Sequence, residues 1–459
     1  MFEIDFKKPI HVYFMGIGGI SMSGLALILL SRGFKVSGSD LKESSLTRQL
    51  ETEGAHIYYS QQISHIDDTV DLVVYTAAVH EDNPELRDAL YRKLPTLTRA
   101  QLLGQLMRNY ELPIAISGTH GKTTTTSMIG DMLLASDTDP TLSIGGILPS
   151  IGGNIRIGHS PYFVTEACEY TNSFLSFFPK ISIVLNVEED HMDFFKDLQD
   201  IQQSFHRFAS LLPKEGILII NNDIKQLERI IDGLDCRVLR YGFSDDCDYY
   251  ATEISYNSQG LPSFMFNRRG KVGISVSLGV PGLHNVSNAL AVLALSDLLA
   301  LPLENTLKAL ENFTGTKRRF EVKGKLGEIT IVDDYAHHPT EIRATLSAAR
   351  SWPHHRIWCI FQPHTYTRTK AFLKEFAAAL SLADYIVLTD IYAARETNTL
   401  GVSSLDLQKE LKKLGAECFY FPTFDEIENF LLQNSVNGDL LITMGAGDIV
   451  KVGEKLLGI

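Results

Sequence analysis

Short apolar runs alternate with helical patterns from the start of the chain. The run at residues 10–15 is nearly continuous, as expected of a strand that is buried on both faces of a sheet. A helical pattern follows over residues 21–31 and ends at Gly33, and further strands are predicted at residues 34–38 and 71–75. This alternation predicts a parallel sheet whose strands are joined by helical crossovers.

The same alternation returns twice more. In the middle of the chain it predicts strands at residues 114–117, 163–166, 181–186 and 217–221, and helices over residues 127–135 and 284–299. Between residues 249 and 278, short alternating stretches are broken at Gln259-Gly260 and Arg269-Gly270, which predicts antiparallel hairpins. After residue 315, strands are predicted at residues 329–333, 356–361, 385–390, 417–421 and 439–444. The chain is therefore predicted to be an α/β protein with three successive segments.

Composition agrees with this organisation. A chain of 459 residues corresponds to about three domains. Lys and Arg total 42 against 55 Asp and Glu, so the net charge is −13, which argues against nucleic-acid binding. No basic stretch followed by an apolar core begins the chain, no apolar run approaches the length of a membrane span, and the five cysteines are scattered. We therefore expect a reduced, cytoplasmic protein without a membrane partner.

A Gly-rich loop between a predicted strand and a predicted helix is the strongest chemical signal. It comprises Gly118, Thr119, His120, Gly121, Lys122, Thr123 and Thr124. Backbone N–H groups at such a helix start bind phosphate oxygens, Lys122 would lie over the β and γ phosphates, and the Thr123 hydroxyl would face magnesium. Only two residues separate Gly118 from Gly121, which departs from the usual spacing. The alternative is an ordinary strand–turn–helix with a chance Gly-Lys-Thr.

Two further residues favour a nucleotide–metal site. Glu166 ends a predicted strand, where ligand sites of parallel sheets form, and His191 follows another strand end. Magnesium favours one or two carboxylates together with phosphates, so Glu166 fits that role, whereas His191 alone would be an unusual ligand. Glu169, close behind Glu166, is expected to be a solvated carboxylate.

A second glycine loop lies near the start of the chain. Gly16, Gly18, Gly19 and Ser21 form a weak Gly-x-Gly-x-x-Ser dinucleotide fingerprint, with Asp40 after the next strand. A dehydrogenase or redox sensor would use such a loop for a pyrophosphate and the acid for a ribose. Against that interpretation, the chain carries two phosphate-binding loops.

Three motifs together resemble the Mur ligases of bacterial cell-wall synthesis: the 118–125 loop, the Glu166-Ala167 strand end and the Asp190-His191 strand end. The resemblance covers essentially the whole chain. It implies that ATP activates a carboxylate, which is then coupled to an amine. The first glycine loop is similar to the one with which the members acting on UDP-N-acetylmuramate and L-alanine bind their UDP-sugar, although Ser21 replaces a glycine.

The resemblance also assigns roles to single residues. Thr76 and Ala77 would contact the diphosphate. Arg99 would either help to hold the first segment against the substrate or be an ordinary surface arginine. His284 and Asn288, one helical turn apart, would face adenine. Catalytic roles would fall to Lys122, His191, Arg319, His338 and Arg368. Thr365 stands where many members have Arg, and Cys168 and Tyr170 also depart from the family pattern.

The resemblance implies a Rossmann-like UDP-sugar-binding domain at residues 1–109. A central P-loop ATPase domain at residues 110–315, mostly parallel with a small antiparallel part, would be followed by a Rossmann-like C-terminal ligase domain at residues 316–459. ATP and Mg²⁺ would be the cofactors of a monomer or weak homodimer in peptidoglycan synthesis. The alternatives are a cell-wall recycling ligase that joins a whole peptide to the same sugar, a redox protein, and a non-catalytic nucleotide-binding module.

Overall fold

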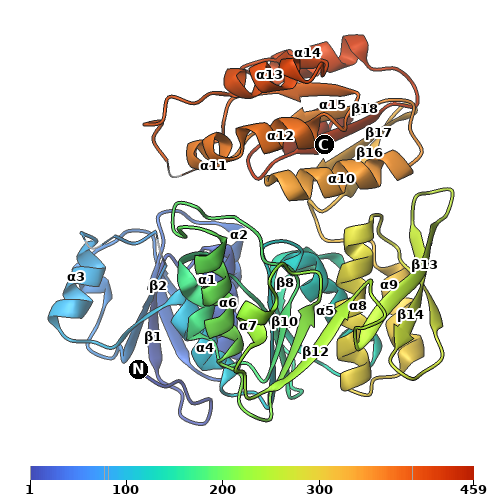
Figure 1. Ribbon diagram of the computed structural model, residues 1–459. Coiled ribbons are helices and arrows are strands. Elements are labelled where there is room, and N and C mark those ends of the chain that lie inside the picture. The colour runs from blue at the N-terminus through green and yellow to red at the C-terminus, as the bar shows by residue number, and fades with distance from the viewer. Residues whose placement is uncertain (1, 77, 81, 395) are drawn as a thin grey trace.

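The computed structural model describes residues 2–76, 78–80, 82–394 and 396–459, which form three α/β domains (Figure 1). The first domain has a parallel sheet in the order β3-β2-β1-β4-β5. Its elements are β1 (His11–Met15), α1 (Ile20–Ser31), β2 (Lys35–Ser39), α2 (Ser45–Thr52), β3 (His56–Tyr58), η1 (Ile63–His65), β4 (Leu72–Tyr75), α3 (Pro84–Tyr91), β5 (Thr96–Thr98) and α4 (Arg99–Met107).

The central domain has a larger sheet in the order β15-β14-β13-β12-β11-β10-β6-β9-β7-β8. Its strands are β6 (Leu112–Ser117), β7 (Thr141–Leu148), β8 (Gly153–Arg156), β9 (Tyr162–Ala167), β10 (Ile181–Val184), β11 (Ile217–Asn221), β12 (Arg237–Gly242), β13 (Tyr249–Tyr256), β14 (Pro262–Arg268) and β15 (Ile274–Ser277). Its helices are α5 (Lys122–Ala135), η2 (Pro149–Ile151), η3 (Tyr170–Ser176), α6 (Leu198–Ala209), α7 (Glu228–Ile231), α8 (Leu283–Leu298) and α9 (Leu303–Asn312). The pairs β13–β14, β14–β15 and β7–β8 are antiparallel.

The third domain has a sheet in the order β16-β17-β21-β18-β19-β20, parallel except for the β16–β17 pair. Its strands are β16 (Glu321–Leu326), β17 (Ile329–Asp334), β18 (Ile357–Phe361), β19 (Tyr385–Leu388), β20 (Cys418–Tyr420) and β21 (Leu440–Met444). Its helices are α10 (Pro339–Ser351), α11 (Tyr366–Ala371), α12 (Leu373–Leu380), α13 (Ser404–Lys413), α14 (Phe424–Asn434) and α15 (Val450–Leu457). Figure 1 shows α10 on the side of this domain that faces the central domain.

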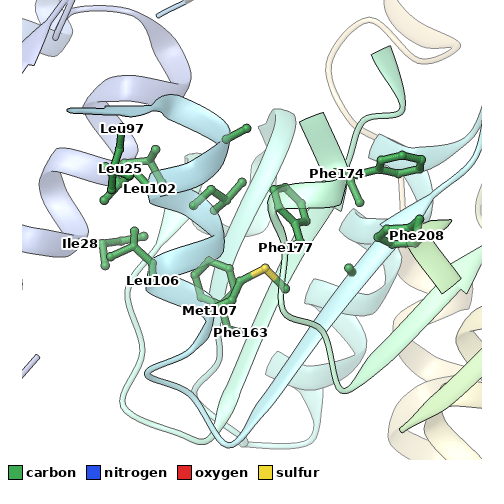
Figure 2. Packing of buried hydrophobic residues seen from close by; sticks show 14 of the residues in the cluster. Leu25, Ile28, Leu97, Leu102, Leu106, Met107, Phe163, Phe174, Phe177 and Phe208 are labelled. Carbon is green, nitrogen blue, oxygen red and sulfur yellow. The ribbon is translucent and has the colours of Figure 1, made fainter. Parts of the chain in front are cut away.

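The continuous apolar run of β1 is explained by burial on both faces. Val12 and Phe14 belong to one hydrophobic cluster, whereas Tyr13 and Met15 belong to another on the opposite face. The first cluster extends without interruption into the central domain. Figure 2 shows α1 and α4 side chains, including Leu106, packed towards Phe163 and the phenylalanines around η3. The first two domains thus share a core, while the third domain has clusters of its own.

The predicted fold class is confirmed, although strands such as β7, β8, β12 and β16 were not predicted and some predicted elements differ at their ends. α5 begins at Lys122, five residues before the predicted start at residue 127, because burial of its threonines outweighs their modest helix propensity. β10 ends at Val184, two residues early, because Asn186 turns to hydrogen-bond the phosphate loop. The hairpins predicted at Gln259-Gly260 and Arg269-Gly270 are present between β13, β14 and β15.

Two general properties follow from the described residues. None of the cysteines forms a disulfide in the structure. In the same parts of the chain, every helix is too short or too polar to cross a membrane.

Candidate active site

The phosphate loop connects β6 to α5 through two glycines that no other residue could replace without movement. Gly121 has a φ of +83° and precedes the first helical residue, and a Cβ there would lie 2.9 Å from Asn288 Oδ1. Asn186 holds Thr119 and His120, the two loop residues between Gly118 and Gly121. Its main-chain oxygen accepts from Thr119 N at 3.1 Å, its Oδ1 accepts from His120 N at 2.7 Å, and its Nδ2 donates to the His120 carbonyl at 3.0 Å. The shape of the loop is therefore fixed by its own glycines together with Asn186, which follows β10.

Lys122 lies in this loop with a carboxylate partner that the sequence did not reveal. Its Nζ lies 3.0 Å from Glu169 Oε2 and also donates to the Thr119 carbonyl at 3.1 Å. Burial alone would lower the pKa of Lys122, but the Glu169 charge raises it above its ordinary value. The expectation that Glu169 is solvated was wrong. Its side chain is 3% exposed, because the chain turns into η3 directly after β9.

Thr123 and Glu166 come together beside the loop. The Thr123 hydroxyl donates to Glu166 Oε2 at 3.1 Å, and Gly145 N donates to the other carboxylate oxygen. Burial raises the pKa of Glu166. A hydroxyl and a carboxylate at the end of a phosphate loop are oxygen ligands of the kind that Mg²⁺ prefers. The donor set therefore fits the predicted ion.

His191 follows β10 in a left-handed conformation with a φ of +54°. Its Nε2 lies 3.9 Å from Glu169 Oε1 and 3.8 Å from Asp190 Oδ2, and its ring stacks on Tyr170 at 4.4 Å. Burial lowers the pKa of His191, which favours the neutral form that can bind a metal. The carboxylates beside this ring are thus Glu169 and Asp190, neither of which was assigned from sequence.

Three third-domain side chains reach the loop after β10. Arg368 forms an ion pair with Asp190, its Nη2 lying 2.9 Å from Oδ1. His338 Nε2 donates to the main-chain oxygen of Glu189 at 3.0 Å, and the Thr340 hydroxyl donates to Glu188 at 2.6 Å. Clustered cations and histidines from two domains can stabilise developing charge on phosphoryl and acyl oxygens.

His120, Glu188 and His338 also lie close enough together for a metal ion. The contacts of His338 argue against such a site. Its Nδ1 accepts from Thr340 N at 3.3 Å, and its Nε2 is bonded to the Glu189 carbonyl. No ring lone pair of His338 is left for a cation, so the trio is a polar contact between domains.

A cavity beside the phosphate loop brings together residues from far apart in the sequence. Six of the predicted site residues line it: His120, Gly121, Thr124, His284, Asn288 and Arg319. Asn288 is buried and donates to Asn285 Oδ1 at 3.1 Å. Asp334 and Glu341, which the sequence analysis did not assign, line the same cavity. Its position over the loop suits a nucleotide, and Phe243, Val280 and Phe320 add apolar surface for a base among the polar groups.

A second cavity lies between the central and third domains. It is lined by Tyr170, Asp190, His191, Met192, Asp193, His364, Thr365, Thr367, Arg368, Lys370, Ala371, Phe372, Ala394, Glu396 and Leu400. Thr365 precedes α11 with a φ of +64°, an uncommon conformation for a β-branched residue. Glu396, another unpredicted residue, accepts from the main-chain N–H groups of Tyr366 and Thr367 and so stabilises that helix start.

The first glycine loop is held by the predicted acid. Asp40 Oδ2 accepts from Gly18 N at 2.8 Å, and a Cβ on Gly18 would lie 2.9 Å from the same oxygen. Gly16 has a φ of +77°, and a Cβ there would lie 3.0 Å from Thr76. Arg99 donates to the Ser21 hydroxyl at 3.0 Å. The predicted residues Gly16, Gly18, Gly19, Ser21, Asp40 and Thr76 thus belong to one loop region, whereas Ala77 lies outside the described residues.

Comparison with known proteins assigns the whole chain. Residues 11–111 match the model "Mur ligase family, catalytic domain", residues 116–296 match "Mur ligase middle domain", and residues 318–447 match "Mur ligase, glutamate ligase domain". A UDP-N-acetylmuramate–L-alanine ligase of Agathobacter rectalis is 57% identical, with 100% of both chains covered, and one of Lachnospira eligens is 56% identical with the same coverage.

Solved structures agree in fold over nearly the full length. The UDP-N-acetylmuramate–alanine ligase of Thermotoga maritima has a TM-score of 0.79 and 32% identity, covering 98% of each chain. A murein peptide ligase of Psychrobacter arcticus has a TM-score of 0.69 and 26% identity, again covering 98% of each chain.

Proposed function

The chain belongs to the Mur ligase family, and from this we propose that it couples L-alanine to the carboxylate of UDP-N-acetylmuramate at the expense of ATP. The products would be UDP-N-acetylmuramoyl-L-alanine, ADP and phosphate, a step of peptidoglycan synthesis. The observation that carries the proposal is the 57% identity, over the full length of both chains, to a ligase named for this pair of substrates.

The three domains would divide the work. The first, at residues 1–109, would bind the UDP-sugar through its glycine loop, Asp40 and the 76–77 strand end. The central domain, at residues 110–315, would bind ATP, with its phosphates on the 118–124 loop and adenine near His284 and Asn288. The third, at residues 316–459, would close the site with Arg319, His338 and Arg368.

The reaction would proceed in two stages. The lactyl carboxylate attacks the γ-phosphorus, the bond to the β-phosphate oxygen breaks, and ADP leaves. The amine then attacks the acyl phosphate, loses a proton and displaces inorganic phosphate through a tetrahedral intermediate. Lys122, held by Glu169, would lie where charge develops on the phosphoryl oxygens, so preorganised electrostatics would supply much of the rate.

Thr123 and Glu166 would hold Mg²⁺, with His191 as a further ligand that follows β10, on the other side of β6 from Glu166. The bound ion would neutralise charge on the phosphates. Arg368 contacts the Asp190 carboxylate, and His338 contacts the main-chain oxygen of Glu189. These two side chains would exclude water from the acyl phosphate, which is readily hydrolysed.

Two alternative activities give different experimental results. A recycling ligase would prefer a preformed peptide, and the higher identity and TM-score of the alanine ligase structure argue against it. A dehydrogenase would use the first glycine loop and Asp40 for a nicotinamide cofactor, but that interpretation gives no role to the second phosphate loop at residues 118–124. An absorbance spectrum of the purified protein that contains bound nicotinamide would favour the redox interpretation.

The decisive experiment measures ADP release with UDP-N-acetylmuramate and one amine at a time. L-Alanine should be the best substrate. Glycine and L-serine should react slowly, because a methyl-sized difference gives only ~10–200-fold discrimination. D-Alanine should hardly react, since the opposite configuration at Cα would direct its methyl group into a steric clash in a pocket that fits the L-isomer. If an alanyl-glutamyl peptide exceeds free L-alanine in kcat/KM, the recycling ligase is the correct assignment.

We propose that the enzyme acts in the cytoplasm as a monomer or weak homodimer, with small molecules as its partners. The net charge of −13 supports the absence of nucleic acid among them. Sedimentation of the purified chain across a concentration series would measure the oligomeric state.

A further inference from the structure

Glu341 occupies the third position of α10 and closes its capping box. Its Oε2 accepts from the main-chain N–H groups of His337 at 3.0 Å and His338 at 3.3 Å, and it also lies 3.3 Å from the His337 ring. The side chain is 13% exposed. One carboxylate oxygen is thereby committed to the start of the helix that carries His338 and Thr340.

The other carboxylate oxygen points across the domain boundary. Oε1 lies 3.2 Å from Nδ1 of His120, in the phosphate loop, and 3.9 Å from the Arg319 guanidinium. Glu341 is thus a single side chain that touches the nucleotide-binding loop of the central domain and two predicted site residues of the third domain.

His120 lies between carboxylates of two domains. Its Nδ1 faces Glu341, and its buried Nε2 lies 3.7 Å from Glu188 Oε2 without a hydrogen-bond partner among the described residues. Burial alone would lower the pKa of His120, but the two carboxylates raise it. Burial alone would raise the pKa of Glu341, but the His337 and His120 imidazoles and Arg319 hold it well below its usual range. The contact therefore favours opposite charges.

We propose that Glu341 is a positioning residue that couples the phosphate loop to the third domain through His120. The main chain of His120 is held by Asn186, so the position of its ring depends on the conformation of the loop. When the loop has the shape that binds phosphate, the ring meets Glu341 and α10 is placed over the site. In another loop conformation the buried carboxylate would lose a partner, which is unfavourable. This inference rests on the proposed function, because it describes how that reaction is organised.

A simpler explanation of these contacts is that Glu341 only caps α10. A substitution that keeps the cap but removes the charge can distinguish this role from the proposed coupling. Gln at this helix position retains the ability to accept from main-chain N–H groups. Glu341→Gln therefore removes the charge towards His120 while keeping the cap. Glu426→Gln is the matched control, because Glu426 closes the capping box of α14 with Thr423 on an exposed part of the same domain.

The steady-state assay uses the full-length enzyme with ATP, UDP-N-acetylmuramate and L-alanine. We expect Glu341→Gln to lower kcat by about 5- to 150-fold, the range of typical coupling between sites. The KM for the UDP-sugar should stay unchanged, because that site belongs to the first domain. Glu426→Gln should behave as wild type. Equal kcat values in both variants would overturn the inference.

A double-mutant cycle tests the His120 contact directly. If the two side chains act through each other, His120→Asn combined with Glu341→Gln should lower kcat little more than the stronger single change. Multiplicative effects would contradict the coupling. We expect an ATP analogue together with the UDP-sugar to compact the wild-type enzyme in small-angle scattering, because the third domain would close over the other two. Should Glu341→Gln fail to fold, the same measurement on His120→Asn decides, because this variant should compact less. Compaction equal to that of wild type would then overturn the inference.

These outcomes are distinct from a failure of the proposed function. If the wild-type enzyme makes no UDP-N-acetylmuramoyl-L-alanine, the proposed function is wrong. If it does, and Glu341→Gln matches wild type in kcat and compaction, only the coupling is wrong.

Discussion

Lys122 Nζ and Glu169 Oε2 lie 3.0 Å apart, so the cation of the phosphate loop is paired with a buried carboxylate from the turn after β9. The pair positions the ammonium group before any phosphate binds. It also brings the turn after β9 into contact with the phosphate loop. The two residues are therefore expected to differ in what their loss does to activity and to stability.

Removing Lys122 should remove most of the catalysis. Lys122→Ala is expected to lower turnover by ~10³-fold, as does the loss of a preorganised charge at similar sites. The measurement is ADP release at saturating substrates. UDP-sugar binding, followed by calorimetry, should survive because another domain provides that site.

Glu169→Gln is the companion variant. It keeps the ammonium group but loosens its position, so its activity should fall between that of wild type and Lys122→Ala. A rate of ADP release from Lys122→Ala equal to that of wild type would show that this lysine does not contribute to phosphoryl transfer.

Glu166 is expected to set the requirement for magnesium. Glu166→Gln keeps a side chain that can bond Gly145 N and Thr123, but it loses the charge. The Mg²⁺ concentration for half-maximal rate should rise by ~10-fold or more, since even indirect ligands change metal affinity by such factors. An unchanged Mg²⁺ titration would show that Glu166 is not a ligand. His191→Ala should raise the requirement less if water replaces the imidazole.

The extent to which sequence predicted the fold depends on where each strand lies. Central strands such as β1 and β18 are nearly continuous apolar runs, and this pattern can be recognised in the local sequence. β16 was not predicted, because it has the sequence Glu-Val-Lys-Gly-Lys-Leu and is partly exposed at a sheet edge. Its pairing depends on the main chain of β17, which a local pattern does not encode.

The candidate site shows the same limit. The residues of the phosphate loop could be predicted because strand, glycines, Lys122 and helix follow one another in sequence. Glu169 and Glu341 could not be, because their roles arise from contacts with Lys122 and His120 that only the folded chain creates. The assigned roles of Arg319, His338 and Arg368 remain predictions that mutagenesis can test.

Asp439 should stabilise the third domain in a pH-dependent way. Its fully buried carboxylate accepts from Arg356 Nη2 at 2.5 Å and from Trp358 Nε1 at 2.9 Å. Burial alone would raise the pKa of Asp439, but the bonds from Arg356 and its neighbours lower it below its ordinary value. The folded state thus binds fewer protons than the unfolded state, in which the pKa is about 3.9. This stabilisation is complete above that pH and is lost as the pH falls through the folded-state pKa.

Asp439→Asn should therefore destabilise the third domain by about 3 kcal/mol at pH 7, as expected when one partner of a buried pair loses its charge. Calorimetric unfolding of the full-length chain across pH 3 to 7 provides the measurement. The difference from wild type should shrink at the acid end. Asp448→Asn, in a half-exposed pair with Lys451, is the control and should change stability little. A difference independent of pH would contradict the assigned charge.

Gly260 should matter for activity because the β13–β14 turn of the central domain packs against the far end of α10. A Cβ on Gly260 would lie 2.4 Å from the Ser351 carbonyl oxygen, whereas one on Gly270, in the next hairpin turn, would meet nothing within 4 Å. Both glycines have a positive φ, +72° and +76°, so alanine at either position should cost a similar ~1–2 kcal/mol in backbone strain.

Only Gly260→Ala should also push on α10, whose opposite end presents His338 and Thr340 to the active site. We expect Gly260→Ala to lose more thermal stability than Gly270→Ala, because only it adds a clash with the main chain. Gly260→Ala alone should also lower kcat, by ~10-fold or more, since small misplacements of catalytic groups are costly. Equal kcat values for the two variants would mean that the turn does not position α10.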